Sequence, residues 1–187
     1  MKISKIASAF KKNKTLCIAS KPNSSEQWIS NGIASYRFDG MPNLTAEHVL
    51  RMFDVGAGQI SDWKCSTAEV DAPHYNDFDE NETEAKEIFM TVKYDGLEYR
   101  FFETDIGILC VNEKYLKPLY DDADYLSFAL RANLEGTPVL AINQGFGLMA
   151  LICPIVIRHG EFLEQLKRLA GDYFRPTQEV KNEQDEN

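Results

Sequence analysis

The sequence predicts an α+β fold, with a mostly antiparallel sheet and helices on one face. Short apolar or alternating segments typical of strands recur from Thr15 to Ile157. Turn dipeptides such as Asp95-Gly96 join several of them, as expected for antiparallel neighbours. Segments with helical spacing flank this strand-rich middle. The 187 residues, 44% of them hydrophobic, are enough for one domain with a substantial core.

The first element is a basic amphipathic helix at residues 2–13. Ile3, Ile6 and Phe10 recur at helical spacing, while lysines occupy most other positions. These lysines form either a solvated polar face or a surface that contacts phosphate. In the second case Lys5, Lys11 and Lys12 are the candidate DNA-binding residues.

Two strands and a second helix follow. Thr15–Ser20 is a short apolar strand, and residues 27–38 form another, in which Asn31-Gly32 marks a bulge or a turn. Thr45 is the expected N-cap of a helix at residues 45–55, although it lacks the Glu that usually completes a capping box.

An acidic stretch interrupts the strand pattern at about residues 66–87. Residues 71–87 contain seven Asp and Glu side chains and few aliphatic ones. This composition predicts a mobile surface loop that is open to proteases. The order of its oxygen-bearing side chains does not match a calcium-binding loop.

The second half predicts more strands. Residues 88–111 contain three, and Asn112 caps a short helix that Pro118 limits. Another strand precedes an apolar hairpin made of residues 138–142 and 146–157, whose second arm is interrupted by Pro154. A helix at residues 160–174 carries an apolar stripe, and a polar tail ends the chain.

Composition and motifs favour a binding protein without a cofactor. The net charge of −9 argues against general coating of nucleic acid but leaves a local basic face open. The four cysteines show no metal-binding spacing, and Cys17, Cys110 and Cys153 lie in apolar contexts that predict buried free thiols. No local constellation indicates catalysis or a metal site, and no stretch is long and apolar enough for a bilayer. The first residues lack the apolar core of a signal peptide, so we expect a cytoplasmic protein.

Residues 108–155 resemble a known family in three places. Asn112, Tyr115 and Leu116 fit an Asn-x-x-Tyr-Leu helix start, and Pro138-Val139-Leu140 fits a Pro-Val-Leu strand. Residues 151–154, Leu-Ile-Cys-Pro, fit a final apolar-x-Pro strand end. In this order and spacing they resemble the last half of the third domain of bacterial DNA sliding clamps, the DNA polymerase III beta subunit.

The resemblance implies a single clamp-like domain at residues 1–158, with 159–187 as an added helix and tail. In the family, the region around the final proline forms a pocket for short peptides, which makes Leu151, Cys153 and Pro154 peptide-binding candidates. Their alternative role is ordinary core packing at a strand end. The implied function is a non-enzymatic, clamp-like protein that acts through a protein partner or self-association, and through DNA backbone contacts. Two alternatives are an interaction or assembly module without DNA binding and an enzyme whose site is not local in sequence.

Overall fold

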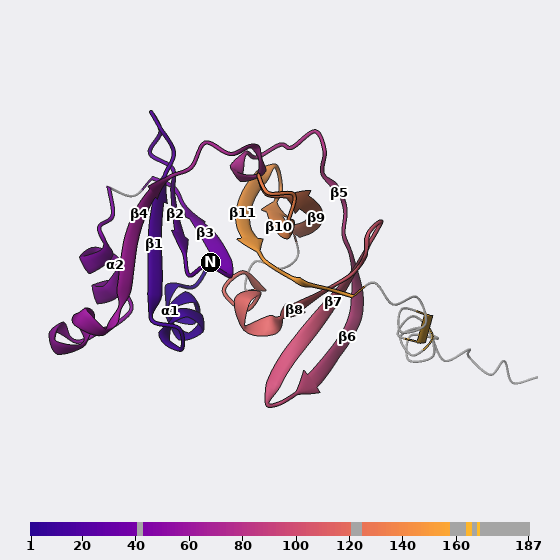
Figure 1. Ribbon diagram of the computed structural model, residues 1–187, viewed down its shortest axis with the longest axis horizontal. Coiled ribbons are helices and arrows are strands. Elements are labelled where there is room, and N and C mark those ends of the chain that lie inside the picture. Colours follow the sequence, from indigo (N-terminus) through magenta and orange to yellow (C-terminus); the bar gives the residue numbers. More distant parts are fainter. Residues whose placement is uncertain (41–42, 121–124, 158–163, 166–167, 169–187) are drawn as a thin grey trace, which may run out of the picture.

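The computed structural model describes residues 1–40, 43–120, 125–157, 164–165 and 168. Its strands form two sheets (Figure 1). The large sheet has eight strands in the order β4-β1-β2-β3-β11-β10-β9-β5, and the small sheet has four in the order β12-β8-β7-β6. Each pair of neighbouring strands is antiparallel except β1 with β4. The predicted α+β class with mostly antiparallel pairing is therefore confirmed.

The N-terminal helix and strands lie close to the positions predicted from the sequence. They are α1 (Ile3–Lys11), β1 (Thr15–Ser20), β2 (Gln27–Ser30) and β3 (Ala34–Phe38). The predicted strand at 27–38 is a hairpin, because Asn31 and Gly32 form a turn in which Gly32 takes a φ of +84°.

The second helix, α2 (Ala46–Met52), begins as predicted at Thr45. A histidine replaces the missing capping-box glutamate: the Thr45 N–H donates to Nδ1 of His48, and the His48 N–H donates to Oγ1 of Thr45, both at 3.3 Å. A 3₁₀ segment, η1 (Ala57–Asp62), leads to the next strand.

The expected acidic loop at 66–87 is only partly a loop. It begins inside β4 (Lys64–Glu69), an exposed strand that pairs in parallel with β1 along its whole length. We call residues 70–82 the strap. They run along the upper border in Figure 1 to β5 (Thr83–Glu84) and contain the 3₁₀ turn η2 (Pro73–Tyr75).

One buried arginine holds the strap against the sheet. The side chain of Arg131, on β9, is fully buried, and its Nη2 atom lies 2.6 Å from a carboxylate oxygen of Glu82. The same guanidinium donates to the carbonyls of residues 74, 76 and 77 at 3.0, 2.6 and 3.2 Å. Asp77 adds a second attachment through the Arg37 guanidinium and the Leu148 N–H. These contacts attach the strap to the sheet at several points, which its composition did not predict, while much of it stays exposed, as expected for a surface loop.

The small sheet contains the three strands predicted between residues 88 and 111. They are β6 (Lys86–Tyr94), β7 (Leu97–Thr104) and β8 (Gly107–Asn112). Asn112 caps the next turn by accepting a hydrogen bond from the Lys114 N–H at 3.1 Å. The predicted helix there is only a three-residue 3₁₀ turn, η3 (Glu113–Tyr115).

The last described strands return to the large sheet and then leave it. They are β9 (Leu126–Ala132), β10 (Pro138–Gln144), β11 (Gly147–Ile152) and β12 (Ile155–Ile157). β11 pairs with β10 and β3, whereas β12 pairs with β8 of the small sheet. Pro154 lies between them, at the point where the chain changes sheets.

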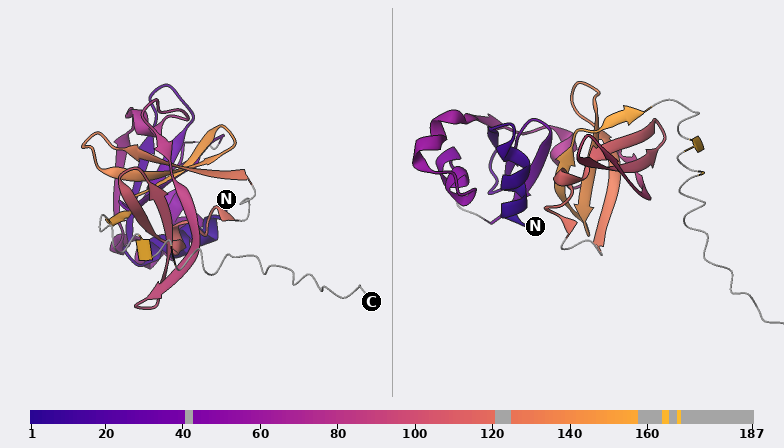
Figure 2. Two further views of the ribbon diagram at one scale, coloured as in Figure 1. Left: turned by 90° about the vertical axis from the view of Figure 1, so that its right-hand side faces the viewer. Right: turned by 90° about the horizontal axis from the view of Figure 1, so that it is seen from below.

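The core lies on both faces of the large sheet. The main cluster joins one face to the helices and includes Phe10 of α1, Leu50 of α2 and Tyr36 of β3. A smaller cluster around Trp28 lies on the other face, beneath strap residue Tyr75. Both α-helices that the structure describes thus pack on one face, as predicted. Figure 2 shows the small sheet beside the end of the large sheet formed by β9, β10 and β11.

The expectation of buried cysteines turns out differently. The four cysteines are free, but none is buried: Cys17 and Cys110 are half-buried, and Cys65 and Cys153 are exposed. The expected helix at residues 160–174 and the tail lie, apart from residues 164, 165 and 168, outside the described residues.

Candidate functional site

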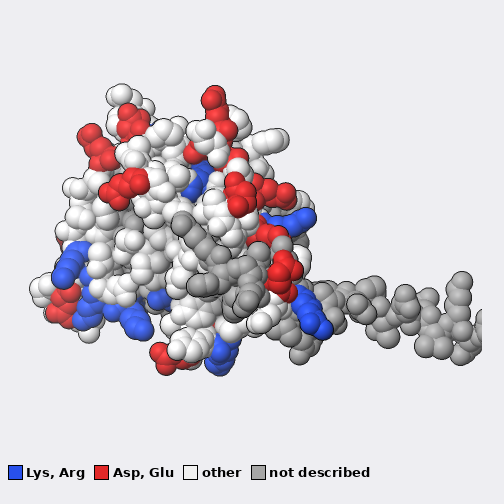
Figure 3. Space-filling view, turned by 45° about the vertical axis from the view of Figure 1, so that its right-hand side comes forward, with Lys and Arg blue, Asp and Glu red and all other residues white. Residues whose placement is uncertain are grey.

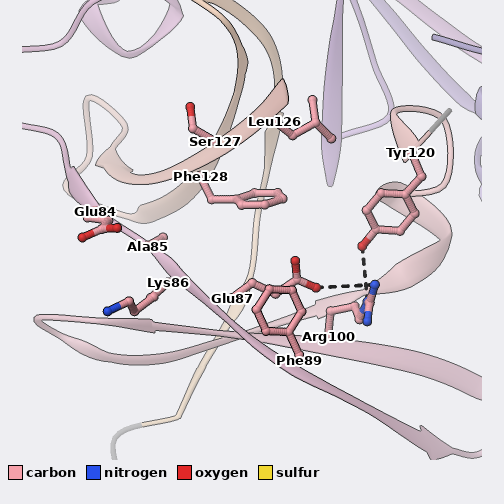
Figure 4. Close-up of a pocket in the computed structure, with 10 residues that line it drawn as sticks. All are labelled: Glu84, Ala85, Lys86, Glu87, Phe89, Arg100, Tyr120, Leu126, Ser127 and Phe128. Carbon is pink, nitrogen blue, oxygen red and sulfur yellow. Dashed lines mark hydrogen bonds and ion pairs between the residues drawn. The ribbon is translucent and has the colours of Figure 1, made fainter. Parts of the chain in front are cut away.

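One surface cavity lies where the two sheets separate (Figure 4). The chain leaves the large sheet after β5 and enters β6 of the small sheet, so β6 and the start of β9 diverge from Ala85. We call the space between them the sheet-junction cavity; its volume is about 630 Å³. It is lined by Glu84, Ala85, Lys86, Glu87, Phe89, Arg100, Tyr120, Leu126, Ser127 and Phe128.

Arg100 is the centre of a charged network in the sheet-junction cavity. Arg100 lies 3.4 Å from a carboxylate oxygen of Glu87 and 3.8 Å from one of Glu113, and its Nε donates to the Tyr120 hydroxyl at 3.3 Å. Burial raises the pKa of the Glu87 carboxyl and raises the pKa of Tyr120 to about 12. Because two carboxylates already face the guanidinium, this network cross-links strands β6 and β7 to η3, and Lys86 is the other cation in the lining.

The second cavity surrounds the point where the chain changes sheets, and we call it the crossover cavity. Its volume is about 380 Å³. Five parts of the chain meet there: the end of α1, the β2–β3 turn, the small sheet, η3 and the segment around Pro154. It is lined by Lys12, Asn13, Ile33, Tyr99, Cys110, Asn112, Lys114, Tyr115, Cys153 and Ile155.

The crossover cavity carries positive charge and no carboxylate. Lys12 and Lys114 reach it from different elements, and its lining contains no Asp or Glu. Among the described residues, neither lysine has a carboxylate within ion-pairing distance. The Lys114 ammonium lies 4.5 Å from the centre of the Tyr115 ring, which holds it at the cavity. The amides of Asn13 and Asn112 are the remaining polar side chains besides the tyrosine hydroxyls and the thiols.

The two thiols of this cavity are poor nucleophiles. Burial raises the pKa of Cys110 to about 11 and also raises the pKa of Cys153. Both therefore stay protonated at neutral pH, whereas a catalytic cysteine needs the thiolate. The cavity is equipped for binding a group with negative charge and some apolar surface, because Ile155 is 62% exposed beside the lysines.

The structure separates the three predicted peptide-binding residues. Leu151 is 4% exposed and packs in the small cluster with Trp28, so it fits the alternative role of a core residue. Cys153 lines the crossover cavity, and its N–H donates to the Ile33 carbonyl at 2.8 Å. Pro154 is half-buried between these surfaces and is absent from the cavity lining.

The three predicted DNA-binding lysines are also divided. Lys11 and Lys12 are exposed at the end of α1, whereas Lys5 is half-buried earlier in the helix. Only Lys12 lines a described cavity, and it is the same one that Cys153 lines. Lys12 and Cys153, two of the predicted site residues, thus line the crossover cavity together, although the sequence indicated a different function for each.

The other members of this cavity were missed, with partial signals in the sequence. Asn112 was identified as a cap, which places Lys114 in the following turn. Ile33, in the β2–β3 turn, and Tyr99, in β7, are distant in sequence and join the cavity only through tertiary packing.

Comparison with protein-family models, with curated proteins and with solved structures finds no match. No group of three His, Cys, Asp or Glu side chains is placed to hold a metal within the described ranges. No helix in those same ranges is long and apolar enough to cross a membrane. The two cavities are therefore the basis for inferring function.

Proposed function

We propose that the protein is a non-enzymatic binding module that holds a segment of another protein chain in the crossover cavity. The observation that carries this proposal is the chemistry of that cavity. In a chain of net charge −9, it places two lysines and exposed Ile155 together with no carboxylate in its lining. Such a surface is complementary to an apolar side chain next to an acidic one.

The expected binding is weak and reversible. Burial of one large apolar side chain contributes about 1.5–3 kcal/mol. An exposed lysine–carboxylate pair adds about 0.2–1 kcal/mol. Association and ordering costs are about as large as this sum or larger, so one segment in this cavity gives at most transient binding.

We also propose that the protein shares its origin with the bacterial DNA sliding clamps. In its favour, β8, the Asn112-capped turn and strands β9, β10 and β11 follow one another in the order that the resemblance implies. Against a DNA-encircling role, η3 has three residues and offers little helix face, and Glu47 and Arg51 on α2 pair with each other at 2.6 Å. The helices thus do not share a basic face, which favours the module without DNA binding.

DNA backbone contact is the second candidate, and Lys11 and Lys12 favour it. Both are exposed at the end of α1. Anisotropy of a labelled DNA duplex at low salt tests it: contact through these lysines predicts binding that weakens with salt and is lost when Lys5, Lys11 and Lys12 are replaced by Glu. Absence of binding at low salt would leave the protein-binding module alone.

The main proposal is tested by placing a photo-crosslinking amino acid at position 155 in the native host cell. Irradiation should give discrete protein adducts, because Ile155 lines the proposed site. The Lys12→Glu/Lys114→Glu double variant should lose those adducts without unfolding, since Lys12 is exposed and Lys114 half-buried. The same crosslinker at Leu134, which is 78% exposed outside the cavity, is the matched control. Equal adducts at both positions, or adducts that survive the charge reversal, would contradict the proposal.

A further inference from the structure

The strap exposes an apolar side chain with acidic sequence neighbours, and these are complementary to the apolar and basic lining of the crossover cavity. Phe78 is 70% exposed, and its sequence neighbours include Asp77 and Asp79, with Glu80 next. The residues on either side are fixed: Asp77 is bound by Arg37 and the Leu148 N–H, and Asp79 accepts from the Asn81 N–H at 3.0 Å. Phe78 is thus an exposed aromatic group on a segment held in place.

We propose that Phe78 of one copy of this chain inserts into the crossover cavity of a second copy. This inference rests on the proposed function, for which it names the occupant. The phenyl ring would contact Ile155 and Tyr99, while the exposed Glu80 carboxylate would face Lys12 and Lys114. A volume of about 380 Å³ is near the lower end for ligand cavities and suits one aromatic side chain with an adjoining acid group.

The charge of the neighbours distinguishes Phe78 from other exposed apolar residues. Phe146 is fully exposed, but Gly145 and Gly147 flank it and its turn carries no acid. Leu134 is 78% exposed next to a single acid, Glu135, and its side chain is aliphatic. Among these three, only the Phe78 segment combines an exposed ring with several acidic neighbours, and acids are what Lys12 and Lys114 favour.

The two surfaces cannot meet within one molecule. The strap covers the face of the large sheet that holds Trp28 and Arg131, whereas the crossover cavity lies on the face with α1 and η3. In Figure 1 the strap runs along the upper border and α1 lies at the lower border. Acidic side chains predominate in the upper part of the face in Figure 3, and Lys and Arg lie mainly in its lower part.

A contact between two different surfaces is heterologous, so it repeats from copy to copy. Each molecule keeps a free strap at one end and a free cavity at the other. The species in solution should therefore grow with concentration into a chain or a closed ring, of which a pair with two reciprocal contacts is the smallest. High salt should reduce the growth, because the lysine–carboxylate pairs lie at the rim of the contact.

Analytical ultracentrifugation of the purified full chain tests this prediction. The wild type should exceed the 21.3 kDa monomer mass as concentration rises. Phe78→Ser should lower the association constant by about 10- to 150-fold, the equivalent of one lost aromatic contact. The Lys12→Glu/Lys114→Glu variant should also be monomeric. Phe146→Ser, which removes a fully exposed ring, is the control and should assemble like the wild type.

Mixing the two monomeric variants gives the decisive measurement. One keeps an intact strap and the other an intact cavity, so the mixture should form a 1:1 dimer that does not grow further. An interface formed by the same surface on both copies would give no such 1:1 dimer. If the mixture stays monomeric, the proposal is overturned. A monomeric wild type would overturn it as well. In that case, adducts to other proteins at position 155 would leave the proposed function standing, and their absence would remove both.

Discussion

Replacing Arg131 with Met should detach the strap and strongly destabilise the protein. The fully buried guanidinium bonds to the Glu82 carboxylate and to three strap carbonyls. Methionine fills similar space but leaves these acceptors unpaired. Removing one partner of a buried ion pair costs about 3–5 kcal/mol. The Glu82 side chain is 26% exposed and can regain water, so we expect a value toward the lower end of that range.

Two measurements test the effect of the Arg131→Met substitution. Urea unfolding by circular dichroism gives the loss in the free energy of unfolding, and amide hydrogen exchange locates it. The amides of residues 70–82 should lose protection first, while those of β10 and β11 keep theirs. Arg51→Met is the matched control, because its pair with Glu47 is exposed and should cost less than about 0.5 kcal/mol. An Arg131 variant as stable as this control, with a protected strap, would refute the assigned role.

Three other outcomes are expected. Burial lowers the pKa of His74 in the strap, so the unfolded chain takes up the proton at a higher pH than the folded chain does. The free energy of unfolding should therefore fall as the pH drops below about 6.5. The His74→Gln variant should not show this loss when urea unfolding is measured at several pH values. Leu151→Asp should unfold the domain, as seen by circular dichroism, because it places an unpaired carboxylate in the core; a folded variant would contradict that placement. Maleimide labelling followed by mass spectrometry should modify exposed Cys153 faster than half-buried Cys110, and equal rates would contradict their difference in exposure.

Local patterns were sufficient to predict most of the strands. Asp95-Gly96 forms the tight turn between β6 and β7 with φ values of +49° and +72°, the conformation that the dipeptide favours. The helix before β1 was predicted from its apolar face, which the structure buries. These elements depend on neighbours in sequence, so the sequence reveals them directly.

Elements that depend on distant partners could not be predicted in this way. Every residue of β4 is exposed, so the strand has no apolar alternation, and it exists because it pairs with β1 some 50 residues earlier. The strap has the composition of a mobile loop, yet Arg131 lies about 50 residues later and fixes it. A polar segment can thus be held by buried partners such as Arg131, which composition alone does not reveal.

The candidate site also combines a feature that the sequence indicates with features that depend on distant partners. Pro154 is the feature that the sequence indicates. The Cys153 N–H still bonds to the Ile33 carbonyl beside the large sheet, whereas Pro154 has no N–H to continue the ladder. The chain then pairs Ile155 with Cys110 in the small sheet. An interruption of pairing at this position separates the two sheets and leaves the crossover cavity between them. The proline was therefore a valid signal of a surface next to a strand end, but the walls of that surface come from elements that only the three-dimensional structure brings together.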